Sequence, residues 1–356
     1  MVVTKSVGQT VRLKTESALF IVMTLSLKKT NAYAPLKPLN PDEVLADYLG
    51  PSFTEYRKRF REAESGLRPP APLHLDVDVL SLCQLSCPMC PSGGAKARFF
   101  PGLNRSLSYQ SYLLALKQAH FLAVPSIRLG VTGEPLLIKN IDQWVSKAHQ
   151  AGFIDISLIT NGQALDYSMS LRLIKSGLTR LMISIDAVSE DTYAKVRPGG
   201  DFKRLINNIE LFLEARERLG GPLPLLRLSF VAMKSNILEL EQFKEKFSDL
   251  ADYLTIQSYL DLGAKNNQAL EASIADPKNP RNQSYCPDPL TRLALLADQS
   301  LFPCCSDFGR LFPVARFPQK SLAQAWNLPQ TKFLASNLGR SSRACQMCLK
   351  AAGSLN

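Results

Sequence analysis

Between residues 73 and 262 the sequence repeatedly alternates short apolar runs with amphipathic stretches. The apolar runs predict strands at 73–80, 126–130, 155–160, 180–186, 225–233 and 253–259. The amphipathic stretches predict helices at 108–121, 142–151, 166–176, 201–219 and 239–247. Repeated βα units imply a parallel sheet with right-handed crossovers, either closed as a barrel or open as part of one. In such folds the chemistry lies at the carboxyl ends of the strands, so the residues after each strand are the candidates for a site.

Three cysteines follow the first predicted strand on one loop, at Cys83, Cys87 and Cys90. Spacings of four and three allow their thiolates to bind one iron–sulfur cluster and to leave its fourth iron without a protein ligand. Catalysis needs such an open position, whereas a structural metal site is closed. Zinc is the rival occupant, but structural zinc sites favour paired CxxC knuckles, and this loop has no obvious local fourth ligand.

Polar segments follow the next three strands in turn. They are Gly133-Glu134-Pro135, Thr160-Asn161-Gly162 and Ser184-Ile185-Asp186. Ser184 and Asp186 are two residues apart, so both side chains project from the same face of their strand. Gly133 allows a close approach of backbone to a ligand, and Glu134 can pair with an ammonium group. Each segment alone is typical of a turn or a solvated strand end, and it is their order along the chain that indicates a site.

With these segments, the loop Cys83-Gln-Leu-Ser-Cys87-Pro-Met-Cys90 resembles the radical S-adenosylmethionine (radical SAM) superfamily over roughly residues 73 to 262. The stretch 184–208, with Val196-Arg197-Pro198-Gly199, is similar to that family throughout. The resemblance implies an α/β fold, a partial (β/α)6 TIM-like barrel in which the open iron binds SAM. It implies SAM-binding roles for Met89, Gly133, Glu134, Pro135, Thr160, Asn161, Ser184, Asp186 and Arg197. Met89 stands where the family often has an aromatic residue near adenine, and it is a flexible apolar substitute.

The remaining cysteines lie near the end of the chain, at positions 286, 304, 305, 345 and 348. Their spacing alone allows zinc or an iron–sulfur cluster. From residue 261 the sequence has little periodicity, which predicts a small irregular domain that buries little apolar surface and is held by metal. The segment resembles the SPASM or twitch extension of radical SAM enzymes, which implies one auxiliary [4Fe–4S] cluster. Its expected ligands are Cys286, Cys304, Cys345 and Cys348, with Cys305 either a spare thiol or the ligand in place of Cys304.

We therefore predict four parts, namely a leader at 1–35, a helical lead-in at 36–72, the barrel at 73–262 and the iron–sulfur domain at 263–356. Asn40 and Pro41 suit the start of the first lead-in helix. The apolar run 18–27 follows basic residues and imitates a signal peptide, but it is too short to span a membrane. Both cysteine sites need reduced thiolates, so we expect a cytoplasmic protein, with Met23 as a possible true start.

The net charge of +11 is spread along the chain without a dense basic block or interleaved aromatic residues, so we predict neither nucleic acid nor membrane as a partner. The resemblance implies an electron donor such as flavodoxin or ferredoxin. Substrate could lie near Arg227, Tyr259, Asp288, Arg292 and Asp307, while His74, His120 and His149 have no clear acid–base role.

The resemblance implies reductive cleavage of SAM to a 5′-deoxyadenosyl radical, which abstracts hydrogen from a substrate carbon. One auxiliary cluster suits a net oxidation of a sugar or other small metabolite. The lead-in lacks the strand-rich module that often captures leader peptides, so we favour this reading over a maturase of a ribosomally made peptide. The non-enzyme alternative is a zinc-stabilised binding protein.

Overall fold

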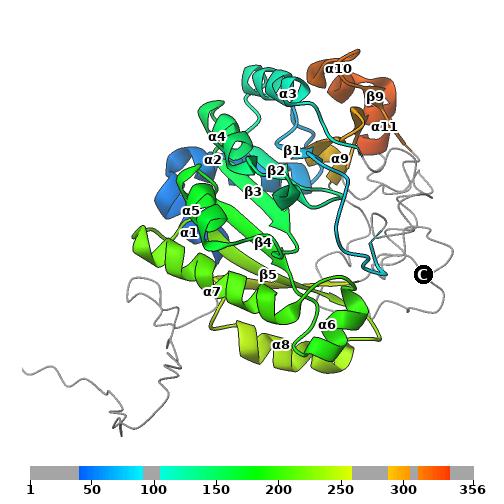
Figure 1. The fold of residues 1–356 in the computed structure, drawn as a ribbon. Coiled ribbons are helices and arrows are strands. Elements are labelled where there is room, and N and C mark those ends of the chain that lie inside the picture. Colours follow the sequence, from blue (N-terminus) through cyan, green and yellow to red (C-terminus); the bar gives the residue numbers. More distant parts are fainter. Residues whose placement is uncertain (1–39, 91–104, 259–287, 305–311, 337–356) are drawn as a thin grey trace, which may run out of the picture. The chain divides into compact units, whose positions relative to one another are not determined.

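The structure is a computed structural model that describes residues 40–90, 105–258, 288–304 and 312–336 (Figure 1). Its strands are β1 His74–Val77, β2 Ser126–Leu129, β3 Asp155–Thr160, β4 Arg180–Ser184, β5 Leu225–Ala232, β6 Tyr253–Ser258, β7 Arg292–Leu295, β8 Ser300–Phe302 and β9 Ala315–Arg316. Its α-helices are α1 Pro41–Leu49, α2 Pro51–Glu64, α3 Tyr109–Phe121, α4 Ile141–Gln150, α5 Tyr167–Lys175, α6 Glu190–Val196, α7 Phe202–Arg218, α8 Leu240–Phe247, α9 Asp288–Thr291, α10 Leu322–Asn327 and α11 Pro329–Ser336. Short 3-10 helices are η2 Pro135–Leu137 and η3 Ile237–Glu239.

The described strands form one sheet in the order β6-β5-β4-β3-β2-β1-β7-β8-β9. Strands β1 to β6 are parallel and lie in chain order, with pairs such as Leu75 beside Ile127 and Leu158 beside Leu181. Helices alternate with these strands along the chain, as Figure 1 shows. The α/β fold with a parallel sheet is therefore confirmed, and every predicted strand and helix is present, with ends that match the prediction or differ from it by a few residues.

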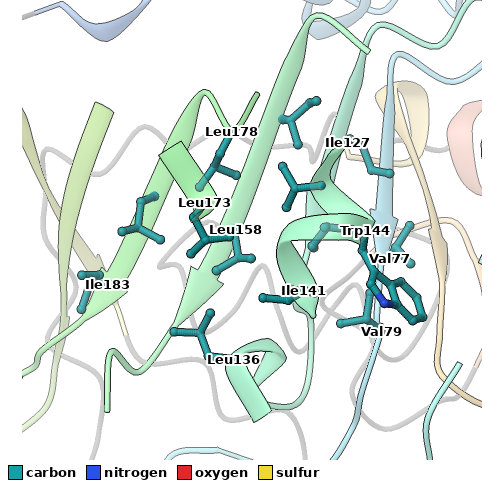
Figure 2. Packing of buried hydrophobic residues seen from close by; sticks show 14 of the residues in the cluster. Val77, Val79, Ile127, Leu136, Ile141, Trp144, Leu158, Leu173, Leu178 and Ile183 are labelled. Carbon is teal, nitrogen blue, oxygen red and sulfur yellow. The ribbon is translucent and has the colours of Figure 1, made fainter. Parts of the chain in front are cut away.

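The two faces of the parallel sheet differ in chemistry. Leu158 of β3, Leu173 of α5 and Trp144 of α4 belong to the large apolar core between the sheet and its helices (Figure 2). Side chains alternate along a strand, so the strand residues on either side of a core position such as Leu158 point to the opposite, inner face of the sheet. That inner face carries charged side chains, among them Asp76 and Arg128, whose ion pair measures 2.5 Å.

Helices α1 and α2 pack against the amino ends of the strands. Asn40 caps α1 by accepting a hydrogen bond from Asp42 N at 3.1 Å, with Pro41 at the first helical position, as the sequence predicts. Phe53 of α2 shares a buried apolar cluster with Leu73, next to β1, and with Leu225 of β5. The lead-in is thus helical and closes the end of the sheet opposite the cysteine loop.

The C-terminal part differs from the expectation in its burial. Strand β7 extends the sheet beside β1 in parallel, with Leu293 opposite Leu75. Trp326 of α10 is fully buried, and the guanidinium of Arg68 lies 4.2 Å from its ring centre. The expectation that this segment buries little apolar surface is therefore wrong for residues 288–304 and 312–336, the part of it that the structure describes. The sequence does not reveal β7, β8 and β9 because strands of two to four residues are too short to show a hydrophobic period. In addition, β1, the parallel partner of β7, lies far away in the sequence.

Several predicted residues lie outside the described residues: Cys286, Cys305, Cys345, Cys348, Tyr259 and Asp307. The leader also lies outside them, and the four predicted domain boundaries remain predictions. Among the helices that the structure describes, none has the length and apolar character that crossing a membrane requires.

Candidate functional site

The cysteine loop follows β1 and folds back on itself. Cys87 is buried, whereas Cys83 and Cys90 are partly exposed. The Cys83 Sγ accepts hydrogen bonds from Leu85 N at 3.4 Å and from Asn161 Nδ2 at 3.6 Å. Cys90 N donates to Cys87 O at 3.1 Å. The loop therefore places Cys83 against the carboxyl end of β3, where Asn161 lies.

Gly133 lies against the backbone that leads into the cysteine loop. A Cβ at this position would lie 2.1 Å from Leu80 O and 2.7 Å from Leu82 O, closer than van der Waals contact permits. Glu134 N donates to Leu82 O at 2.9 Å. The sequence predicts that Gly133 allows a ligand to approach, whereas in the structure it allows the cysteine loop to approach.

We expect Gly133→Ala to displace the cysteine loop and to destabilise the protein by about 1–3 kcal/mol, the usual cost of an overpacked site. Bound iron should fall with it, because the loop carries the three thiols. Urea unfolding and iron analysis of the anaerobically reconstituted protein measure both effects. Gly221→Ala is the matched control, since a Cβ there meets nothing within 4 Å. Equal stability and iron content in the two variants would contradict this role of Gly133.

Glu134 is buried and joins the ends of β2 and β3. Its Oε1 accepts hydrogen bonds from Thr160 Oγ1 at 2.6 Å and Leu136 N at 3.0 Å. Its Oε2 accepts one from Asn161 N at 2.7 Å. Burial raises the pKa of Glu134 above its ordinary value, against the lowering effect of these hydrogen bonds. The carboxylate thus holds Thr160 and Asn161 in place, and the predicted contact of Glu134 with an ammonium group remains a prediction.

Asp186 and Arg197 form a buried ion pair beside Cys87. Asp186 is fully buried and has a φ of 64°, which is rare for a residue with a side chain. Its carboxylate accepts hydrogen bonds from Arg197 Nε at 2.9 Å and from Val231 N at 2.8 Å. Arg197 Nη1 lies 3.9 Å from Cys87 Sγ, and the coulombic attraction of Asp186 raises the pKa of Arg197 despite its burial. The predicted strand-end carboxylate therefore positions a cation next to a cysteine.

Three other predicted SAM-binding residues make fewer polar contacts. The Oγ atoms of Ser184 and Ser229 lie 3.5 Å apart on neighbouring strands. Met89 packs against the large apolar core. Pro135 begins η2 and is buried. Their contacts with SAM remain predictions.

Sequence reasoning missed three residues that hold the site together. Asp78, just after β1, accepts hydrogen bonds from Thr132 N at 3.0 Å and Thr132 Oγ1 at 2.7 Å. Gln84 Nε2 donates to Asn161 Oδ1 at 3.3 Å. Asn236 Nδ2 donates to Asp186 O at 2.9 Å. Asp78 follows a strand end, as Asp186 does, and that signal was available, whereas Asn236 lies in a loop segment without a pattern.

The donor set of the loop fits an iron–sulfur cluster. A four-iron cluster takes one thiolate per iron, so three cysteines bind three irons and leave one open. Burial raises the pKa of Cys87 to about 11, while the nearby Arg197 lowers it and so favours the thiolate that metal binding requires. Across the described ranges, no three His, Cys, Asp or Glu side chains surround a point that a single metal ion would occupy. The ligands of a cluster need not meet at one point.

The second cysteine site cannot be assembled from the described residues. Cys304 follows β8 and is partly buried. Its three expected partners lie outside the described ranges.

Comparisons with known proteins agree with this geometry. Residues 78–223 match the protein family described as the Radical SAM superfamily. A probable GTP 3′,8-cyclase of Methanocaldococcus jannaschii is 27% identical over 188 residues, which are 53% of this chain and 59% of that protein. A GTP 3′,8-cyclase of Clostridium botulinum strain Hall is 33% identical over 140 residues, 38% of this chain and 42% of that protein. The chain thus spans about half the length of the curated relatives that it matches.

Two solved structures share the fold. SuiB of Streptococcus suis bound to S-adenosylmethionine has a TM-score of 0.59 at 16% identity, covering 84% of this chain and 76% of SuiB. Native anSMEcpe with bound AdoMet has a TM-score of 0.57 at 14% identity, covering 78% of this chain and 88% of that protein. At these identities the likeness concerns the fold alone.

Proposed function

Since residues 78–223 match the Radical SAM superfamily, we propose that this chain is a radical SAM enzyme that binds a [4Fe–4S] cluster through Cys83, Cys87 and Cys90 and cleaves SAM reductively. The observation that carries the proposal is the cysteine loop itself, supported at Cys83 by Asn161 and at Cys87 by Arg197. The bound cluster and SAM supply a 5′-deoxyadenosyl radical that abstracts hydrogen from a substrate carbon.

The residues of the chain orient these groups. Asn161 and Arg197 direct N–H groups at two of the three ligand sulfurs, and hydrogen bonds to sulfur tune the reduction potential of a cluster. Ser184 lies on the inner face at the carboxyl end of β4, where we place SAM. Gly133, Glu134 and Thr160 support the cysteine loop and the end of β3, so their role toward SAM is to fix the shape of its site.

We propose a small metabolite as the substrate and a net oxidation as the outcome. The described lead-in is helical and covers the amino ends of the strands, which leaves their carboxyl ends to the substrate. The relatives are named GTP 3′,8-cyclases, and a nucleotide is a small molecule. A peptide is the second candidate, because another structure of SuiB, with a TM-score of 0.57, is bound to the precursor peptide SuiA.

The auxiliary site and the partners complete the proposal. We assign one further [4Fe–4S] cluster to Cys286, Cys304, Cys345 and Cys348, which would accept an electron from the substrate or help to place it. A flavodoxin or ferredoxin would supply the first electron. Reduced thiolates suit the cytoplasm, where we place the enzyme.

The test is an anaerobic reaction with SAM, a reductant and candidate substrates labelled with deuterium. We expect about eight irons per chain after reconstitution with both clusters. Deuterium should move from one substrate carbon into 5′-deoxyadenosine, which mass spectrometry detects and which identifies both substrate and carbon. A colourless protein that holds zinc and forms no 5′-deoxyadenosine would overturn the proposal in favour of a binding protein.

A further inference from the structure

The inner face of the sheet carries a group of charged residues near the amino ends of the strands. Arg227 of β5 belongs to it, because Leu226 and Leu228 on either side are fully buried in the apolar core. Its side chain therefore points to the face opposite the helices. Its neighbours across the sheet are Met182 and Tyr253.

The carboxylates of this face already have cationic partners. Asp76 receives Arg128 Nη2 at 2.5 Å and Arg292 Nη1 at 3.3 Å. It also lies 3.1 Å from Nε2 of His74, whose pKa is lowered by burial. A second carboxylate, at the start of β3, has its own arginine. Asp155 receives Arg180 Nε at 3.0 Å and also accepts a hydrogen bond from Thr179 Oγ1 at 2.8 Å.

Within the described ranges, Arg227 has no such partner. It makes no ion pair or hydrogen bond with any residue that the structure describes, and its Nε is buried without an acceptor. Burial lowers the pKa of Arg227 to about 10; the nearby Tyr253 opposes this, and the positive charges of Arg128 and Arg180 add to it. Arg227 as a whole is half-buried, with its Nε fully covered, and a covered cation without a counter-charge destabilises a fold unless something compensates for it.

The position of Arg227 connects this charge to the proposed reaction site. Ser229 comes two residues later on the same face, about 7 Å along the strand, and lies beside Ser184. Helices α1 and α2 cover the amino ends of the strands, so a ligand of Arg227 enters from the carboxyl ends. A molecule that reacts there can extend an anionic group inward to Arg227.

We propose that Arg227 binds an anionic group, a carboxylate or a phosphate, of the molecule bound inside the sheet's inner face. The planar guanidinium matches both anions with paired hydrogen bonds. The inference rests on the proposed function, which puts both the substrate and SAM at the carboxyl ends of the strands. Arg227 lies farther from the carboxyl ends of the strands than Ser184, beside which we place SAM. This position favours the substrate as the source of the anion, and the methionine carboxylate of SAM is the other source.

The test compares anion binding by the full-length, reconstituted protein and its Arg227→Gln and Arg227→Lys variants. Inorganic phosphate and acetate are the probes, titrated by calorimetry. We expect Arg227→Gln to weaken binding of one probe at least tenfold and Arg227→Lys to retain part of it. Arg218→Gln is the matched control, because Arg218 ends α7 at the surface, and its affinity should equal that of the wild type. Equal affinity in all four proteins, or no binding of either probe to the wild type, overturns the inference.

A titration with SAM separates the two sources. Loss of probe binding with unchanged SAM affinity in Arg227→Gln assigns the anion to the substrate. A tenfold weaker SAM affinity in the same variant assigns it to the methionine carboxylate. Failure of the wild type to form 5′-deoxyadenosine would overturn the proposed function and leave the anion comparison standing.

Stability gives a second and independent measure. Without an anion, Arg227→Met should raise the melting temperature, because it removes an uncompensated buried charge. Added phosphate should raise the melting temperature of the wild type and not that of this variant. A lower melting temperature of Arg227→Met without anion would show a structural partner for Arg227 and would contradict the inference.

Discussion

Replacing Cys83, Cys87 and Cys90 together with alanine is expected to abolish SAM cleavage and to leave a folded protein. The three thiols are the proposed ligands of the SAM-binding cluster, and no substitute donor follows them on the loop. Two of them are partly exposed, so their truncation opens no large cavity in the core. Iron should fall from about eight to about four per chain if the auxiliary cluster is present. Anaerobic reconstitution, iron analysis and chromatography of 5′-deoxyadenosine measure these changes.

Ser86→Ala is the control for this experiment. Ser86 lies between two of the cysteines and is exposed, and its backbone N donates to Pro198 O at 2.9 Å, a bond that the substitution keeps. Its iron content and SAM cleavage should match the wild type. SAM cleavage retained by the triple variant would mean that the loop does not hold the catalytic cluster.

The sequence predicts the core of the fold because each strand from β1 to β5 is followed by its own helical segment. Strand β3, predicted at 155–160, is Asp155–Thr160 in the structure. Strand β7 escapes prediction because it is only the four residues Arg292–Leu295 and pairs with β1 across most of the chain. Local periodicity carries no information about such a distant partner.

The same distinction holds in the site. The order of the motifs places Asn161 and Asp186 at strand ends on one side of the sheet. In the structure Asn161 contacts Cys83 directly, and Asp186 is linked to Cys87 through Arg197. The order of the motifs cannot indicate that Gly133 contacts the backbone of Leu80, because that contact depends on how two loops fold over each other. Nor can the order of the motifs indicate that Arg227 lacks a counter-charge among the described residues, which depends on how the other charges of the inner face pair.

Asp186→Ala is expected to destabilise the protein by about 3–5 kcal/mol, the usual cost of breaking a buried ion pair. The substitution leaves the buried guanidinium of Arg197 without its carboxylate and Val231 N without an acceptor. Alanine at a φ of 64° adds strain of about 1 kcal/mol. Bound iron should also fall, because the pair holds Arg197 beside Cys87.

Two further variants separate the contribution of the Asp186 charge to stability from that of the backbone conformation. Asp186→Asn keeps an acceptor for Val231 N and tolerates the positive φ, so its loss of stability should lie between those of the wild type and Asp186→Ala. Glu241→Ala breaks the exposed pair with Lys244, at 2.6 Å, and should change the free energy of unfolding by no more than about 0.5 kcal/mol. Urea unfolding of the three variants gives the comparison. If Asp186→Ala were no less stable than Glu241→Ala, the Asp186–Arg197 pair would not be what holds the end of β4 against the cysteine loop.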